Sequence, residues 1–381
     1  MNFVSFVVKR IFEEDSYFMK YLSEFRDPTR TRALAQEIER LLSGRNIRLM
    51  EVCGTHTVSI FRSGLKSLLP SSLRLISGPG CPVCVTPQKK IDTIIAYARR
   101  PDTIITTFGD MLNVPGTESS LREEKSRGAD IRMVYSPLES LTIAHDNPEK
   151  KVIFLAIGFE TTIPTGAATV IEAQKAGLDN FFLIPAGKLI PPAMEFLLSQ
   201  GDAEIDGFLC PGHVSVIIGT KPYLKIAKKF GVPCVVAGFE PIDILAAIRE
   251  LLILINEGRA EVRNLYPRVV REEGNPLARK IMDEVFQPAD TEWRGLGVIP
   301  QSGLRLRTEL EKYDISLTDP VETPPSRENP ACICGEILRG VSEPPDCPAF
   351  KKACLPTHPL GPCMVSSEGT CAAWYRYGKP E

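Results

Sequence analysis

The chain has 381 residues, of which 43% are hydrophobic and 24% are charged. This composition is typical of a folded protein, and the length exceeds that of one typical domain, so we expect two or three domains. The 47 acidic and 45 basic residues give a net charge of −2, which provides no broad electrostatic attraction to nucleic acid or to an anionic membrane.

The amino-terminal segment, residues 1–27, is expected to form a helical extension packed on the first domain. It has only a short apolar run and no preceding basic region, unlike a signal peptide. The most apolar helical stretch, residues 243–258, is interrupted by Arg249 and Glu250 and is shorter than the roughly 20 residues that span a bilayer. We therefore expect a cytoplasmic protein.

Short β-branched segments alternate with helical patterns through the first two thirds of the chain. Such alternation predicts an α/β fold with parallel sheets. The expected strands are residues 47–53, 73–78, 103–108, 131–136, 151–158, 181–186, 206–210 and 233–237.

Eight strand-helix units are also compatible with an eight-fold βα barrel. After the fourth strand, however, residues 140–150 are too short for a full crossover helix, and Pro148 interrupts them. We therefore predict two tandem, open, Rossmann-like parallel α/β domains, over residues 28–137 and 138–260. A helical linker and a small cysteine-rich domain follow in residues 261–381.

Chemically reactive residues follow several predicted strands, at the sheet edge where ligands bind in open parallel sheets. Cys81 and Cys84 lie in the segment GPGCPVC, between the second strand and a helix that begins near Thr86. Because a helix amino terminus stabilises a thiolate, this pair is either a redox dithiol or half of a soft-metal site, unless both thiols are incidental.

Cys53 and His56 follow the first strand in the segment CGTHT, and Asp110 follows the third strand in FGDM. Cys53 and His56 together with the Cys81 and Cys84 pair suit a site for iron, zinc or copper. The alternative is that Cys53 is a packed thiol and His56 a structural histidine. Asp110 either orients His56 or accepts a proton, or it caps a turn.

The segment CPGHVS, after the seventh strand, contains Cys210 and His213. We expect Cys210 to be packed in the core and His213 to be a polar group of the cleft. Cys234 lies inside the apolar segment VPCVVAGF and is also expected to be a core residue.

A dense cysteine cluster occupies the carboxyl-terminal region of the chain. Six structural disulfide partners are improbable in a cytosolic protein, so the cluster indicates metal binding. The spacing lacks the paired Cys-x-x-Cys units of zinc ribbons, and four thiolates around a cubane cluster would leave two cysteines over. The six residues are Cys332, Cys334, Cys347, Cys354, Cys363 and Cys371.

The segments CGTHT, GPGCPVC, FGDM, GFETT and CPGHVS, in this order before the cysteine cluster, resemble the hydrogenase maturation family HypD from about residue 28 to the end. The resemblance implies a fold of two similar α/β domains and a third domain that binds a 4Fe–4S cluster. The family pattern Cys-x14-Cys-x6-Cys-x16-Cys falls on Cys332, Cys347, Cys354 and Cys371. Cys334 and Cys363 match an additional dithiol pair of the family.

The resemblance also implies a function. The family holds an iron atom while two cyanides and one carbon monoxide are attached, for the large subunit of nickel–iron hydrogenase. Cys53 would hold this iron jointly with a cysteine of the small partner HypC, with His56 and Asp110 in support. Cys81 and Cys84 would be the redox dithiol, and the cyanides would come from a transient partner, HypE.

This reading describes an assembly scaffold with redox activity rather than a conventional turnover enzyme. The alternative is an iron–sulfur protein disulfide reductase that passes electrons from the cluster through Cys81 and Cys84.

Overall fold

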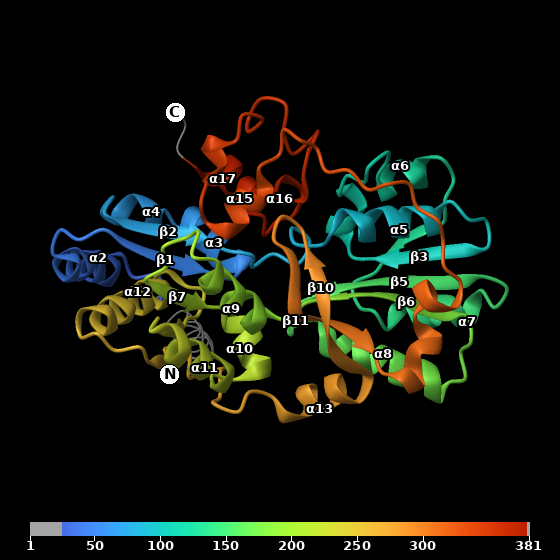
Figure 1. Ribbon diagram of the computed structural model, residues 1–381, viewed down its shortest axis with the longest axis horizontal. Coiled ribbons are helices and arrows are strands. Elements are labelled where there is room, and N and C mark those ends of the chain that lie inside the picture. The colour runs from blue at the N-terminus through green and yellow to red at the C-terminus, as the bar shows by residue number, and fades with distance from the viewer. Residues whose placement is uncertain (1–24, 379–381) are drawn as a thin grey trace, which may run out of the picture.

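The computed structural model describes residues 25–378 and has two parallel sheets, a long hairpin and a cysteine-rich lobe (Figure 1). Most of the predicted amino-terminal extension therefore lies outside the described residues. The two separate open sheets confirm the predicted parallel α/β class and exclude the closed barrel. Within residues 25–378, none of the helices has the length and apolarity needed to cross a lipid bilayer.

The first sheet has five parallel strands in the order β2-β1-β7-β8-β9. They are β2 (Leu73–Ser77), β1 (Ile47–Glu51), β7 (Gly207–Cys210), β8 (Cys234–Val236) and β9 (Val262–Asn264). The helices associated with this half of the molecule are α2 (Pro28–Leu42), α3 (Gly54–Arg62), α4 (Leu65–Leu68), α10 (Gly212–Ile218), α11 (Lys221–Phe230) and α12 (Pro241–Asn256). Strand β1 is an interior strand between β2 and β7, and Leu49 and Met50 on its two faces are fully buried.

The second sheet has four parallel strands in the order β4-β3-β5-β6. They are β4 (Ile131–Met133), β3 (Thr103–Thr107), β5 (Lys151–Gly158) and β6 (Phe181–Gly187). The helices that connect or follow these strands are α5 (Gln88–Ala98), η1 (Gly109–Asn113), α6 (Leu121–Ser126), α7 (Glu139–Asp146), α8 (Ile163–Lys175) and α9 (Ile190–Gln200).

The strands are distributed between the sheets differently from the predicted division at residues 137 and 138. The chain builds β1 and β2, forms the whole second sheet, and then returns to complete the first sheet with β7, β8 and β9. The return pairs β7 with β1 in parallel, with Leu49 opposite Gly207. Because β1 is buried, its backbone N–H and C=O groups need hydrogen-bond partners at both edges, and β2 supplies partners at only one.

The region after residue 260 also differs from the predicted helical linker. Strand β9 is followed by α13 (Pro276–Val285) and then by an antiparallel hairpin of β10 (Phe286–Trp293) and β11 (Gly297–Leu306). The short helices η2 (Thr308–Tyr313) and α14 (Ile315–Thr318) complete this region. In Figure 1 the hairpin stands near the middle of the molecule, beneath the cysteine-rich lobe.

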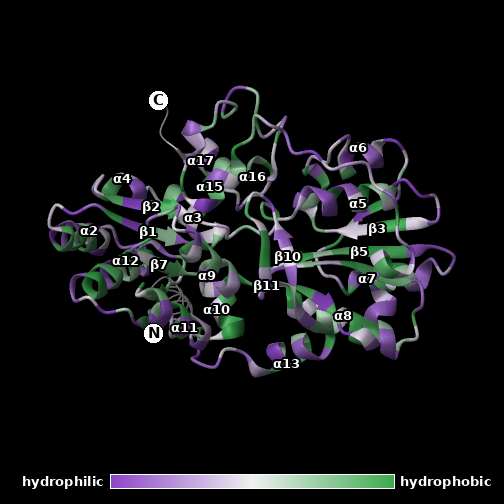
Figure 2. Cartoon of the chain, in the orientation of Figure 1, coloured by the Kyte–Doolittle hydropathy of each residue, from purple (hydrophilic) through white to green (hydrophobic). Residues whose placement is uncertain are grey.

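The carboxyl-terminal lobe, residues 331–378, lies over the junction of the two sheets (Figure 1). Its helices are α15 (Cys334–Arg339), η3 (Pro344–Asp346), α16 (Pro362–Val365) and α17 (Thr370–Tyr377). The rings of Phe61 in α3 and Trp374 in α17 are 5.0 Å apart, which joins the lobe to the first sheet. Figure 2 shows hydrophobic residues along β5 and β11 and many hydrophilic residues on peripheral loops and helices.

Candidate metallocentre and dithiol site

Cys53 lies immediately before α3, at the carboxyl end of β1. The Gly54 amide donates to the carbonyl of Gly80 at 3.0 Å, so the loops after β1 and β2 are joined backbone to backbone. A Cβ on Gly80 would lie 2.2 Å from the Cys53 nitrogen, which means that only glycine allows this approach. The segments CGTHT and GPGCPVC therefore meet at one sheet edge, as expected from parallel strands.

The Cys53 thiol is only 7% exposed. Burial raises its pKa to about 12, the nearby Glu368 carboxylate adds to the increase, and the backbone N–H groups of His56 and Thr55 oppose it. The free thiol is therefore protonated at neutral pH. A soft metal that binds Cys53 must displace this proton.

Glu51, two residues before Cys53, is a buried carboxyl group that the sequence analysis did not identify. It accepts hydrogen bonds from Thr57 Oγ1 and Ser77 Oγ, each at 2.6 Å. Burial raises its pKa to about 8, against the opposing effect of these hydrogen bonds. Glu51 thereby fixes the end of β1 to α3 and to the end of β2.

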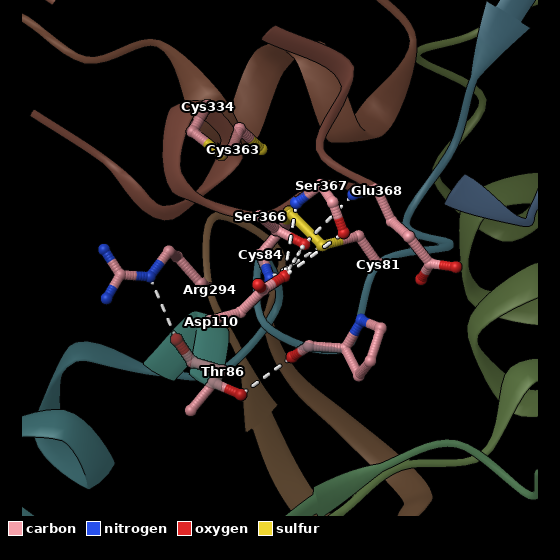
Figure 3. Close-up of a disulfide and its surroundings, with 11 residues drawn as sticks. Cys81, Cys84, Thr86, Asp110, Arg294, Cys334, Cys363, Ser366, Ser367 and Glu368 are labelled. Carbon is pink, nitrogen blue, oxygen red and sulfur yellow. Dashed lines mark hydrogen bonds between the residues drawn. A yellow bond between two sulfur atoms is a disulfide. The ribbon is translucent and has the colours of Figure 1, made fainter. Parts of the chain in front are cut away.

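Cys81 and Cys84 form a disulfide in the loop between β2 and α5 (Figure 3). The two residues are 3% and 0% exposed, and the Cys84 amide donates to Cys81 Sγ at 3.2 Å. Helix α5 begins at Gln88, slightly later than the predicted start near Thr86. The pair is thus a buried disulfide beside the Cys53 loop.

His56 does not contact Asp110 in this structure. Its Nε2 atom bonds to the carbonyl oxygen of Gly238 at 2.9 Å, and burial lowers its pKa to about 4. The ring of Phe239 contacts both predicted histidines: it stacks on His213 with centroids 4.1 Å apart and lies tilted against His56 with centroids 4.8 Å apart. Both histidines therefore lie at the carboxyl end of β8.

Asp110 instead binds the carboxyl-terminal lobe. Its Oδ2 atom accepts hydrogen bonds from Ser366 Oγ at 3.1 Å and from the Ser367 amide at 3.2 Å (Figure 3). Glu368, next in the same loop, accepts from Thr55 Oγ1 at 2.6 Å. One loop of the lobe therefore contacts the strand-end loops of both sheets.

A cavity of about 390 Å³ opens beside the disulfide loop, at the carboxyl ends of β3, β4 and β5. The cavity is lined by Pro82 and Val83, which lie between the two cysteines in the sequence, and by Asp110, Tyr135 and Glu368. Glu368 is a second residue that the sequence analysis missed. The available signal was an acidic side chain within the cysteine cluster, three residues before Cys371.

All six carboxyl-terminal cysteines line one mainly apolar hollow, together with Ile337, Phe350, Leu360 and Met364. Within the described residues, no group of three or more His, Cys, Asp or Glu side chains converges on a single metal ion. The ligands of a 4Fe–4S cluster bind separate iron atoms, so they need not converge on one point. The all-thiol donor set and apolar walls therefore fit such a cluster.

Cys334 and Cys363 are the closest of these cysteines, with their Sγ atoms 2.9 Å apart. Hydrogen bonds from Cys332 and Cys363 lower the pKa of Cys334. Cys210 and Cys234, in contrast, are fully buried in the first sheet, as predicted for core residues.

Comparison with known proteins identifies the family. A profile described as "HypD: Hydrogenase formation hypA family" matches residues 29–378. The chain belongs to the HypD family. The hydrogenase maturation factor HypD of Azotobacter vinelandii is 47% identical over 369 residues, which cover 95% of this chain and 97% of that protein.

Other HypD relatives show the same extent of similarity. HypD of Escherichia coli is 43% identical over 370 residues, covering 95% of this chain and 99% of that protein. The hydrogenase expression/formation protein HupD of Azotobacter chroococcum is 47% identical over 369 residues, with coverage of 95% and 97%. The HypD similarity thus includes both sheets, the hairpin and the cysteine lobe.

Proposed function

We propose that this chain is a hydrogenase maturation factor on which an iron atom receives two cyanides and one carbon monoxide. The observation that carries the proposal is the contact of the cysteine lobe with both strand-end loops, through Asp110 with Ser366 and through Glu368 with Thr55. This contact joins the lobe and its thiol-lined hollow to the loop that contains Cys53. Figure 3 shows the Cys81–Cys84 disulfide in the same region as Cys334 and Cys363 of the lobe.

Cys332, Cys347, Cys354 and Cys371 would hold a 4Fe–4S cluster. Such a cluster supplies single electrons when it is bound. The apolar residues around the hollow limit access of water, and the Leu360 amide donates to Cys354 Sγ at 3.4 Å. Hydrogen bonds to ligand sulfur are one of the factors that set the reduction potential of a cluster.

Cys53 would hold the iron that is being modified, together with a cysteine of the partner HypC. A single soft thiolate at a strand-end loop binds iron yet leaves other positions open, unlike a closed site of four protein ligands. The cyanides would come from HypE, and the product would pass to the hydrogenase large subunit. This is the work of a cytoplasmic assembly scaffold, not of a conventional turnover enzyme.

Asp110, His56 and the dithiols would support this work in different ways. Asp110 fixes the lobe over the site through Ser366 and Ser367, whereas His56 anchors α3 to the end of β8. Reduction of the Cys81–Cys84 disulfide to two thiols requires two electrons and two protons. The Cys334–Cys363 pair is the second dithiol for such exchange.

The alternative, a reductase that cleaves disulfides of protein substrates, is disfavoured by the burial of its reactive pair. Cys81 and Cys84 are 3% and 0% exposed. Thiol–disulfide exchange needs direct access of the attacking sulfur to the disulfide. A folded substrate therefore has no route to these sulfurs in this conformation.

Iron analysis tests the proposal. We expect the chain purified without oxygen to contain about four iron atoms and to show a 4Fe–4S spectrum, because four cysteines are the usual ligands of such a cluster. The complex with HypC should contain additional iron, and Cys53→Ala should lose this increment but keep the cluster. Cys210→Ala is the matched control, because Cys210 is also a buried free thiol. Zinc in place of iron, or extra iron retained by Cys53→Ala, would contradict the proposal.

A further inference from the structure

Arg294 is a buried cation at the turn between β10 and β11, and it is only 5% exposed. Its backbone N–H donates to the carbonyl of Val85 at 3.0 Å, and Nε donates to the carbonyl of Thr86 at 2.9 Å (Figure 3). Nη2 donates to Gln88 Oε1 at 2.7 Å. The side chain is therefore fixed to the segment that directly follows Cys84.

The same turn also contacts the cysteine lobe. Gly295 has a φ of +71°, and a Cβ on it would lie 2.2 Å from the Cα of Gly335. Gly335 follows Cys334, which lines the thiol-lined hollow together with the four proposed cluster ligands. Arg294 therefore lies where the segment after Cys84 meets the cysteine lobe.

The known contacts of Arg294 balance its charge poorly. Thr86 and Gln88 offer neutral oxygen atoms. The Glu328 carboxylate is 4.0 Å from Nε, and its side chain is 47% exposed, so water screens this pair. A buried cation without a close anion is costly. The lobe that this turn contacts contains the thiol-lined hollow, which would hold four thiolates around a cluster, an anionic group.

We infer that Arg294 is the buried countercharge of the iron–sulfur cluster and raises its reduction potential. The inference rests on the cluster proposed above. Reduction adds one electron and one negative charge to the cluster, and a fixed positive charge nearby stabilises the reduced state more than the oxidised state. Because the guanidinium is buried and held by two hydrogen bonds, its effect is little reduced by solvent.

A redox titration of the full-length chain, purified without oxygen and followed by electron paramagnetic resonance, tests this inference. We expect Arg294→Gln to shift the equilibrium about tenfold toward the oxidised cluster, which is about 59 mV for a one-electron couple. Arg294→Lys keeps the charge and should stay within about threefold of the unsubstituted chain, by the same relation. Arg305→Gln is the matched control, since Arg305 is an exposed arginine of the same hairpin.

Glu328→Gln gives an independent test of opposite sign. It removes the exposed carboxylate beside Arg294, so the potential should rise at low ionic strength. An unchanged potential in Arg294→Gln would overturn the inference. If that variant loses the cluster, a potential in Glu328→Gln that is equal to or below the original value would overturn it. Absence of a cluster from the unsubstituted chain would instead contradict the proposed function.

Discussion

Glu51 should make the stability of the protein depend on pH. Its carboxyl group is 3% exposed, and burial raises its pKa from 4.5 to about 8. Between these values the unfolded chain has released the proton, whereas the folded chain retains it. Stability therefore falls as pH rises through this range, by up to about 1.4 kcal/mol per pH unit, and is unaffected below pH 4.5. At pH 7 the cost is about 3 kcal/mol.

Glu51→Gln should remove this dependence, because an amide does not ionise in this range. The glutamine oxygen can still accept the hydrogen bonds from Thr57 and Ser77. We expect the free energy of unfolding of the variant to exceed that of the unsubstituted chain by an amount that grows from pH 5 to pH 8. Glu160, whose pKa burial raises to about 7, should leave part of the slope in both proteins.

Urea unfolding followed by circular dichroism, at several pH values between 5 and 8, measures this difference. Glu39→Gln is the control, because Glu39 is an exposed glutamate on α2. A constant difference between Glu51→Gln and the unsubstituted chain across this pH range would refute the reasoning, because it would mean that Glu51 is ionised in the folded state.

Three further predictions concern the contacts of the site. Burial raises the pKa of the Cys53 thiol from 9.0 to about 12, so at neutral pH it should react with iodoacetamide about 10³-fold more slowly than an ordinary thiol. Mass spectrometry of the peptide that contains Cys53 measures this rate. Rapid labelling would contradict the burial of the thiol. Asp110→Ala removes the acceptor of the Ser367 amide, so hydrogen exchange at Ser367 should accelerate roughly tenfold. The control is Asp146→Ala, which changes an exposed aspartate and should leave this exchange rate unchanged. Equal exchange in the two variants and the unsubstituted chain would show that the contact does not hold the loop. Gly295→Ala places a Cβ 2.2 Å from the Cα of Gly335 and should lower the free energy of unfolding by at least about 2 kcal/mol. Gly297 has a similar φ but open space around it, so Gly297→Ala should lower it by only about 1 kcal/mol. Equal losses in the two variants would contradict the close contact.

The positions of the first eight strands could be predicted because each is a short apolar segment bounded by turn residues. The predicted strand 151–158 coincides with β5, and the predicted strand 47–53 contains β1. Their assignment to sheets could not be predicted in this way. Hydrophobic pattern shows that a strand is buried on both faces, but not which strand lies beside it. The pairing of β1 with β7 depends on tertiary contacts across more than 150 residues.

The hairpin was missed for a different reason. Strand β10 contains Pro288, and its sequence, FQPADTEW, has large apolar residues only at its two ends. Proline and acidic residues are disfavoured in strands, so local preference argues against one here. Pairing with β11 overrides that preference, and the turn that results brings Arg294 to the lobe.

Cysteine residues of the site were recognisable, whereas its charged residues were not. Cys53, Cys81 and Cys84 stand in glycine-containing segments at strand ends, where such side chains have few structural roles. Glu51 and Glu368 are single acidic residues without any local marker. Only the folded structure shows that both lie beside Cys53.

The most direct test of the central claim is infrared spectroscopy of the complex between this chain and its proposed partner HypC, prepared with the proposed cyanide donor HypE. We predict absorption bands of iron-bound cyanide and carbon monoxide in the complex, and their loss in Cys53→Ala, because Cys53 is the buried thiol at the meeting point of the two strand-end loops. The control Cys210→Ala should retain the bands. Bands of equal intensity in the Cys53→Ala complex would contradict the claim that Cys53 holds the iron.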